Sequence, residues 1–247
     1  MRISHPRSVQ IPLLRQLWKT VFADTDAFLD SFFSIAYCPD RCLCAMEDEL
    51  LTGMLYWLPC EKYAYIYAVA TRPSHRGKGI CRALMEAAHE AIARQGYEGA
   101  ILYPQEEDLR TMYRKMGYHT ETFIAQGNFL SGTAPAPLTF LSGEQYFALR
   151  QQYLPEGAVC QGTPFRELLK SLTFCKGEDF LLAAEDRGDI LFGLELLGNP
   201  AQAPGILKAL GKKSGSFRYP GGNAPFAMFR PLRENASAPK YFAFPLE

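Results

Sequence analysis

Residues 69–81 read Val69-Ala70-Thr71-Arg72-Pro73-Ser74-His75-Arg76-Gly77-Lys78-Gly79-Ile80-Cys81. This order predicts a strand that enters a glycine-rich loop and continues as a helix. The loop amides and the first helical turn lack intrahelical partners, and with the helix dipole they suit a phosphate or pyrophosphate. Gly77 and Gly79 permit unusual dihedral angles and a close approach to the backbone. Arg76 and Lys78 add positive charge at the mouth of the loop.

The loop by itself has a simpler interpretation, which is a surface loop with two incidental glycines. Two known nucleotide-binding patterns are absent from it. It contains no GxxxxGK[ST], and its glycine spacing is not GxGxxG, which argues against a kinase and a Rossmann dehydrogenase. The function therefore depends on what surrounds the loop.

The elements around the loop describe one domain. Before it, helical periodicity and strand composition predict two helices, a hairpin and a third strand, at residues 11–22, 26–35, 41–46 with 50–58, and 63–71. After it, the pattern predicts a long helix from Ile80, then a strand, a helix and a strand, at residues 99–103, 107–115 and 118–124. This order is typical of an α/β or α+β domain that ends near residue 130.

The chain beyond residue 130 predicts a second domain. Residues 131–137 have the composition of a linker. Ser142 and Gln145 form a capping-box pattern for a helix that ends at Tyr153, and Pro164 opens another helix. Two apolar runs, at residues 180–185 and 190–197, predict a hairpin. We therefore expect a first domain at residues 1–130 and a second at 138–247.

Short matches indicate that the second domain repeats the first. They pair Leu14-Arg15-Gln16 with Leu149-Arg150-Gln151, Ala45-Met46-Glu47-Asp48 with Ala183-Ala184-Glu185-Asp186, and Gly53 with Gly193. Tyr103-Pro104 would match Tyr219-Pro220, and these two are closer together in the sequence than the members of the other pairs. This predicts that the second half lost the third strand and the glycine-rich loop. Chance similarity of short apolar segments is the alternative. Because the loop has no copy, we expect one active site, in the first half.

A second motif follows the loop and reads Met112-Tyr113-Arg114-Lys115-Met116-Gly117-Tyr118. It resembles the Leu-Tyr-x-Lys-x-Gly-Phe/Tyr segment of the GNAT superfamily of N-acetyltransferases. The run Arg76-Gly77-Lys78-Gly79-Ile80-Cys81 resembles that family's Arg/Gln-x-x-Gly-x-Gly/Ala loop, with Cys81 in place of the small last residue. The family often has an asparagine upstream of the tyrosine, where this chain has residues 105–108, Gln-Glu-Glu-Asp. The resemblance covers about residues 10–130.

The resemblance implies a mixed, mostly antiparallel sheet flanked by helices, followed here by a smaller, degenerate repeat of the same fold. It implies that acetyl-CoA lies where two strands splay apart, and that an amine attacks its thioester directly. The cofactor-binding residues it implies are Val69, Ala70 and Thr71 for the pantetheine arm and Arg76, Gly77, Lys78, Gly79, Ile80 and Cys81 for the pyrophosphate. A backbone amide on the same strand would stabilise the oxyanion, and Tyr113 would protonate the departing thiolate.

The general base is not identified by the sequence. The residues considered are Glu61, His75, Glu106, Glu107, the tyrosines at 63, 65 and 67, and the carboxylate that ends the apolar segment 240–247. A chain of water molecules is a further possibility. Tyr113 has its own alternative, a tyrosine packed in the core. A non-catalytic acyl-CoA sensor and a structural interaction protein remain alternatives to the acyltransferase.

Composition limits the partners. The 247 residues include 26 Lys and Arg and 26 Asp and Glu, so the net charge is zero and no nucleic-acid footprint is expected. No apolar run predicts a membrane span, and the first residues do not resemble a signal peptide. Seven dispersed cysteines without a CxxC pair favour reduced thiols in the cytoplasm and no metal site. The expected acceptor is a small-molecule or peptide amine, and the oligomeric state is left open.

Overall fold

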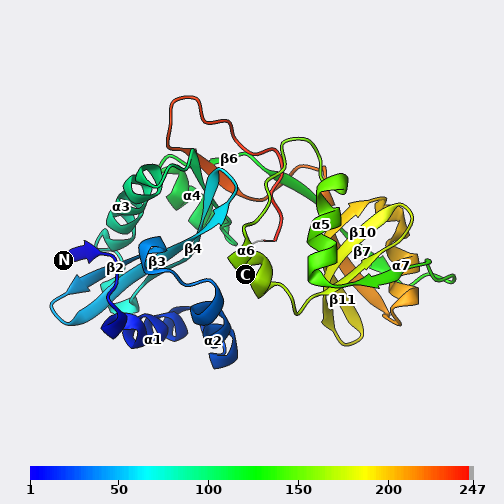
Figure 1. The fold of residues 1–247 in the computed structure, drawn as a ribbon, viewed down its shortest axis with the longest axis horizontal. Coiled ribbons are helices and arrows are strands. Elements are labelled where there is room, and N and C mark those ends of the chain that lie inside the picture. The colour runs from blue at the N-terminus through cyan, green and yellow to red at the C-terminus, as the bar shows by residue number, and fades with distance from the viewer. Residues whose placement is uncertain (245–247) are drawn as a thin grey trace. The chain divides into compact units, whose positions relative to one another are not determined.

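The computed structural model describes residues 1–244, which form two compact units (Figure 1). The first unit contains residues 1–119, 160–168 and 228–238, and the second contains residues 120–159, 169–227 and the segment from 239. The units therefore differ from the expected segments 1–130 and 138–247. Strand pairing causes the difference, since segments distant in sequence complete each sheet.

The first unit is built on a seven-stranded sheet with the order β1-β2-β3-β4-β5-β14-β6. Strands β4 and β5 pair in parallel, whereas the pairs β1–β2, β2–β3, β3–β4 and β5–β14 are antiparallel. The strands are β1 (Arg2–Ser4), β2 (Cys42–Glu47), β3 (Leu50–Cys60), β4 (Tyr63–Thr71), β5 (Gly99–Leu102), β6 (His119–Thr120) and β14 (Met228–Pro231). This is the mixed, mostly antiparallel sheet that the resemblance implied.

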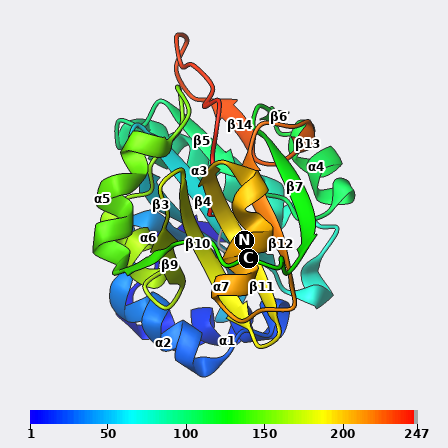
Figure 2. The same ribbon diagram turned by 90° about the vertical axis from the view of Figure 1, so that its right-hand side faces the viewer.

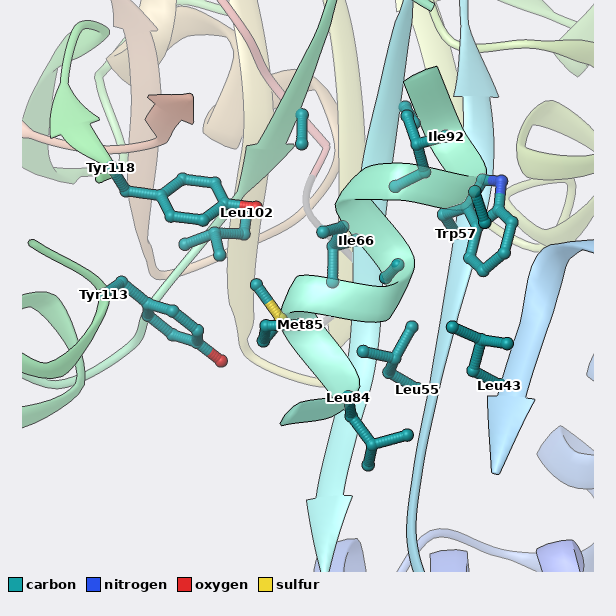
Figure 3. Close-up of a cluster of buried hydrophobic side chains, with 14 of the residues drawn as sticks. Leu43, Leu55, Trp57, Ile66, Leu84, Met85, Ile92, Leu102, Tyr113 and Tyr118 are labelled. Carbon is teal, nitrogen blue, oxygen red and sulfur yellow. The ribbon is translucent and has the colours of Figure 1, made fainter. Parts of the chain in front are cut away.

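Helices cover both faces of this sheet, and their bounds are α1 (Ile11–Phe22), α2 (Asp26–Ile35), α3 (Ile80–Arg94), α4 (Glu107–Arg114) and α6 (Thr163–Leu168). Figure 1 shows α3 and α1 on opposite faces of β2–β4. On the α3 face a buried core joins the strands to the helix through Leu43, Leu55, Trp57, Ile66, Leu84, Met85 and Ile92 (Figure 3). On the α1 face Trp18 packs against Phe32, Tyr56 and Tyr67, at ring-centroid distances of 4.7, 5.1 and 5.6 Å.

The second unit also contains a seven-stranded sheet, with the order β13-β7-β12-β11-β10-β9-β8. Its strands are β7 (Phe123–Leu130), β8 (Thr139–Leu141), β9 (Thr173–Lys176), β10 (Phe180–Arg187), β11 (Ile190–Gly198), β12 (Ser214–Pro220) and β13 (Ala224–Pro225). Its helices are α5 (Gly143–Tyr153) and α7 (Ala203–Ala209). The capping box of Ser142 and Gln145 and the hairpin of β10 and β11 are confirmed.

The predicted strand at residues 118–124 is wrong. Thr122 leaves the strand direction, because its carbonyl and hydroxyl accept the amides of Phe226 and Ala227, at 2.9 and 2.8 Å. The segment therefore splits into β6 and β7, and β7 pairs with β12 in the second sheet (Figure 2). The position beside β5 in the first sheet is taken instead by β14.

The two sheets fit a repeat of one topology. The chain order β1-α1-α2-β2-β3-β4-α3-β5 has the same sequence of elements as β8-α5-α6-β9-β10-β11-α7-β12. In both, antiparallel pairs are followed by one parallel pair, β4–β5 or β11–β12. The expected loss of the third strand is therefore wrong, since β11 occupies its place. The second half is instead shorter in the helix that connects its two parallel strands. This helix has 7 residues in α7, whereas its counterpart α3 has 15.

The apolar end of the chain was expected to pack as a strand. Residues 241–244 are buried, but within the described residues only a single bridge links Tyr241 to Ala158. The expected role of the terminal carboxylate concerns Glu247, which lies outside the described residues. Between residues 1 and 244, no helix is both long and apolar enough to cross a membrane. None of the seven cysteines, which all lie between residues 1 and 244, forms a disulfide bond.

Candidate functional site

The glycine-rich loop has the geometry expected for an anion cradle. After β4 the chain makes a short 3-10 turn at Pro73–His75 and enters α3 through Gly77 and Gly79, whose φ angles are +76° and +80°. Gly79 is the N-cap of α3, makes no side-chain capping bond, and is followed by a first turn without acidic residues. The first amides of α3 are therefore open to a negatively charged ligand.

Strands β4 and β5 separate beside this loop. Their pairing joins Tyr63–Tyr65 to Gly99–Ile101, while β4 continues to Thr71. Over residues 66–71 the β5 side of β4 thus has no strand partner among residues 1–244. An edge of this kind can accept an extended ligand as an additional strand.

A β-bulge interrupts β4 at this open edge. The pairing with β3 shifts register between Met54 and Tyr56, and Ala68 on β4 has a φ of +49°. Such a bulge re-aims the backbone groups next to it, and bulges are frequent beside active sites. Ala68 is not predictable from the sequence, because alanine gives no local signal for a positive φ.

A pocket of about 750 Å³ joins the loop to the open edge of β4. Of the residues predicted to bind the cofactor, those that line it are Val69, Thr71, Arg76, Gly77, Gly79, Ile80 and Cys81. Ala70 is 1% exposed and Lys78 is exposed, and neither belongs to the lining. The lining also includes Val21 and Phe22 of α1 and Leu109 and Met112 of α4, which sequence analysis did not identify.

Tyr113 lies on α4 within the buried core, and it is not among the residues that line the pocket. Its side chain is 7% exposed, and its ring packs edge-to-face against Tyr118 at 5.8 Å. Figure 3 shows the hydroxyl groups of both tyrosines pointing toward α3. Burial raises the pKa of the Tyr113 hydroxyl, and the thiol of Cys81 on α3 contributes to the rise. Tyr113 is therefore part of the core through its ring, and its hydroxyl keeps its proton near a pocket-lining residue.

Only some of the candidate general bases lie at the pocket. Glu106 and His75 line the pocket, and the Nε2 atom of His75 lies 3.7 Å from a carboxylate oxygen of Glu47. Glu107 instead forms an ion pair with Arg114 at 2.8 Å. Glu61 is exposed in the turn between β3 and β4. Glu106 is the one carboxylate in the pocket lining among the described residues.

Comparisons with known proteins agree on the fold. Residues 2–120 match the family described as acetyltransferase (GNAT) domain. No curated protein matches the sequence. The fold is similar to crystal structures of GCN5-related N-acetyltransferases from Kribbella flavida and from Anabaena variabilis ATCC 29413. The first is 14% identical with a TM-score of 0.70, covering 94% of this chain and 72% of that chain. The second is 16% identical with a TM-score of 0.72, covering 94% and 73%.

A third similar structure, the GCN5-related N-acetyltransferase from Sphaerobacter thermophilus, is 10% identical with a TM-score of 0.60. The similarity covers 97% of this chain and 98% of that chain, so it includes both sheets. At such identities the likeness establishes the shared fold alone.

Proposed function

Because residues 2–120 belong to the acetyltransferase (GNAT) domain family, we propose that this chain transfers an acetyl group from acetyl-CoA to a primary amine. One observation carries the proposal. The open edge of β4, the glycine-rich loop, and Leu109 and Met112 of α4, which are close in sequence to Tyr113, border a single pocket. The loop suits a pyrophosphate, and the strand edge suits the two amides of a pantetheine arm.

Different residues of the chain bind different parts of the cofactor. Amides of the segment Arg76–Cys81 hold the pyrophosphate, with Arg76 and Lys78 adding positive charge. The backbone of Val69, Ala70 and Thr71 pairs with the pantetheine arm. Ala70 needs only its backbone groups for this role, and Lys78 needs only its charge, which acts at a distance. Both are consistent with the absence of these residues from the pocket lining.

Bound acetyl-CoA supplies a thioester whose carbonyl carbon is attacked by the amine nitrogen, with loss of the carbon–sulfur bond. A backbone amide of β4 at the Ala68 bulge stabilises the negative charge that develops on the carbonyl oxygen. Tyr113 donates its proton to the departing sulfur. Glu106, alone or through water, accepts the proton that the amine loses. The sulfur leaves as the thiol of CoA and the nitrogen becomes part of the product amide. Glu106 gains one proton and Tyr113 gives one up, so the protons balance.

The decisive experiment mixes the protein and acetyl-CoA with a panel of small amines and amino-terminal peptides, and measures free thiol with a chromogenic disulfide. We expect amine-dependent thiol release for at least one acceptor, together with the acetylated product by mass spectrometry. Tight acetyl-CoA binding without turnover across the panel would favour the alternative, a non-catalytic acyl-CoA sensor. Heat-denatured protein serves as the control for spontaneous hydrolysis.

Replacing Gly79 by alanine should raise the Kd for CoA by about tenfold. A Cβ at Gly79 meets no atom within 4 Å, so the effect comes from the φ of +80°. An L-residue held there loses about 1–2 kcal/mol, and relaxation of the loop would misplace the amides that hold the pyrophosphate. Gly188→Ala is the matched control, since Gly188 has a φ of +73° and equally open surroundings in the second unit. Equal Kd values in both variants, measured by titration calorimetry, would contradict the assignment.

We extend this proposal to the acceptor, the compartment and the second half of the chain. The acceptor is a small-molecule or peptide amine, and the chain works in the cytoplasm without a metal ion. The second half is a degenerate copy without a glycine-rich loop, so catalysis is confined to the first.

A further inference from the structure

A second pocket adjoins the proposed cofactor pocket along α3. Its volume is about 270 Å³, and it lies between one face of α3, the turn after α4, and β14. Arg82 and Met116 line both pockets, so the two are neighbours. Neither the glycine-rich loop nor Tyr113 contributes to this second pocket, which therefore has no role in the mechanism above.

Positive charge dominates this pocket. Three cationic side chains line it, Arg82 from α3, Lys115 after α4 and Arg230 from β14, against a single carboxylate, Glu86. Among residues 1–244 none of the three cations forms an ion pair. Arg230 is held in place because its guanidinium donates to the carbonyl of Met116. Three cations without carboxylate partners around one cavity favour an anion as its occupant.

A buried histidine adds a neutral donor to the same pocket. His89 is 5% exposed and lines the cavity, and its Nε2 lies 2.8 Å from the Tyr118 hydroxyl. Its Nδ1 is buried and has no hydrogen-bond partner among the described residues. Burial and the nearby Arg230 lower the pKa of His89 to about 3, so the ring is neutral. In the tautomer in which Nε2 accepts from Tyr118, the ring proton is on Nδ1, which is then an unused donor.

We propose that this pocket binds a phosphate monoester. Arginine and lysine side chains together with one N–H donor match the three charged oxygens of such a group. The position of this pocket next to the cofactor pocket favours the 3′-phosphate of coenzyme A as the source, and this part of the proposal rests on the proposed function. Free phosphate is the other source of the same chemistry.

The test compares the affinity for CoA with that for 3′-dephospho-CoA by titration calorimetry. In the wild type the Kd for 3′-dephospho-CoA should exceed that for CoA at least tenfold, which corresponds to about 1.4 kcal/mol. Lys115→Met should lower this ratio severalfold without a comparable change in the Kd for 3′-dephospho-CoA. Arg82→Met should also lower the ratio, and it should weaken 3′-dephospho-CoA as well, because Arg82 lines both pockets. Both side chains are exposed, so the variants should fold. Arg94→Met is the matched control, since Arg94 lies on α3 outside this pocket.

A separate titration with inorganic phosphate distinguishes the sources. One outcome is that CoA and 3′-dephospho-CoA bind with equal Kd values while inorganic phosphate binds in the presence of CoA. If Lys115→Met then weakens the binding of phosphate, the pocket binds a separate phosphate and not that of the cofactor. Equal binding of both cofactors without phosphate binding overturns the proposal, and so does a tenfold ratio that persists in both variants. If the wild type binds no CoA, the proposed function fails, and the phosphate titration alone then decides whether the pocket binds anions.

Discussion

Replacing Tyr113 by phenylalanine should lower kcat by about 10²–10³-fold, within the range typical of a lost general acid. The substitution removes only the hydroxyl and keeps the ring that packs at 5.8 Å from Tyr118, so folding should be preserved. Because burial raises the pKa of Tyr113, the proton is retained at every pH at which ordinary tyrosines keep theirs. The acid function would be lost only as the pH rises through that elevated pKa. The measurement is steady-state thiol release with saturating acetyl-CoA.

The neighbouring Tyr118 provides the control. It is also a buried tyrosine near α3, but its hydroxyl lies 2.8 Å from His89. Tyr118→Phe should therefore cost stability, by leaving the other nitrogen of His89 without a partner, and should change kcat only a few fold. If Tyr113→Phe and Tyr118→Phe have equal kcat values, Tyr113 is a core residue and not the acid. The Kd for CoA should stay within about twofold in Tyr113→Phe, because the Tyr113 side chain lines neither pocket.

Sequence patterns predicted the local elements well because those elements depend on local chemistry. The bounds of α1 and α2 follow from apolar spacing, and β4 follows from its aromatic and β-branched residues. The glycine-rich loop was predicted because its positive φ angles need glycine, and glycine is visible in a sequence. For the same reason the anion cradle was the part of the site most readily found.

Features that depend on distant pairing were not predictable from local patterns. The bulge at Ala68 accompanies a shift in the register between β3 and β4, and the alanine itself gives no sequence signal for the bulge. Arg230 reaches the α3 pocket only because β14 pairs with β5, and no spacing links a residue near the end of the chain to Lys115. The boundary near residue 130 followed the proline-rich composition, whereas the sheets are completed by β7 and β14.

Replacing Arg150 by methionine should destabilise the second unit by about 3–5 kcal/mol, the range for removal of one partner of a buried ion pair. Arg150 of α5 and Glu195 of β11 are 1% and 0% exposed, and two bonds of 2.6 and 2.9 Å join them. Tyr146 and Tyr241 donate to the same carboxylate at 2.6 and 3.0 Å. Without Arg150 the carboxylate keeps two neutral donors but loses its counter-charge in a site from which water is excluded.

The unfolding experiment can assign this loss to one unit. Both tryptophans, Trp18 and Trp57, lie in the first unit, so their fluorescence reports its unfolding, while circular dichroism reports both. Arg150→Met should lower the denaturant midpoint seen by circular dichroism more than the midpoint seen by fluorescence. Lys213→Met is the control, because Lys213 forms an ion pair with Asp189 in which the side chains are 79% and 67% exposed, and such pairs contribute about 0–1 kcal/mol.

A double variant separates the lost attraction from the buried charge. Arg150→Met combined with Glu195→Met removes both charges and should recover much of the stability, since the penalty of the single variant comes from the carboxylate left unpaired. Recovery would be incomplete, because Tyr146 and Tyr241 would then lack their shared acceptor. If the double variant is less stable than Arg150→Met by the full cost of a second deletion, the pair does not act as a unit and the expected coupling is refuted.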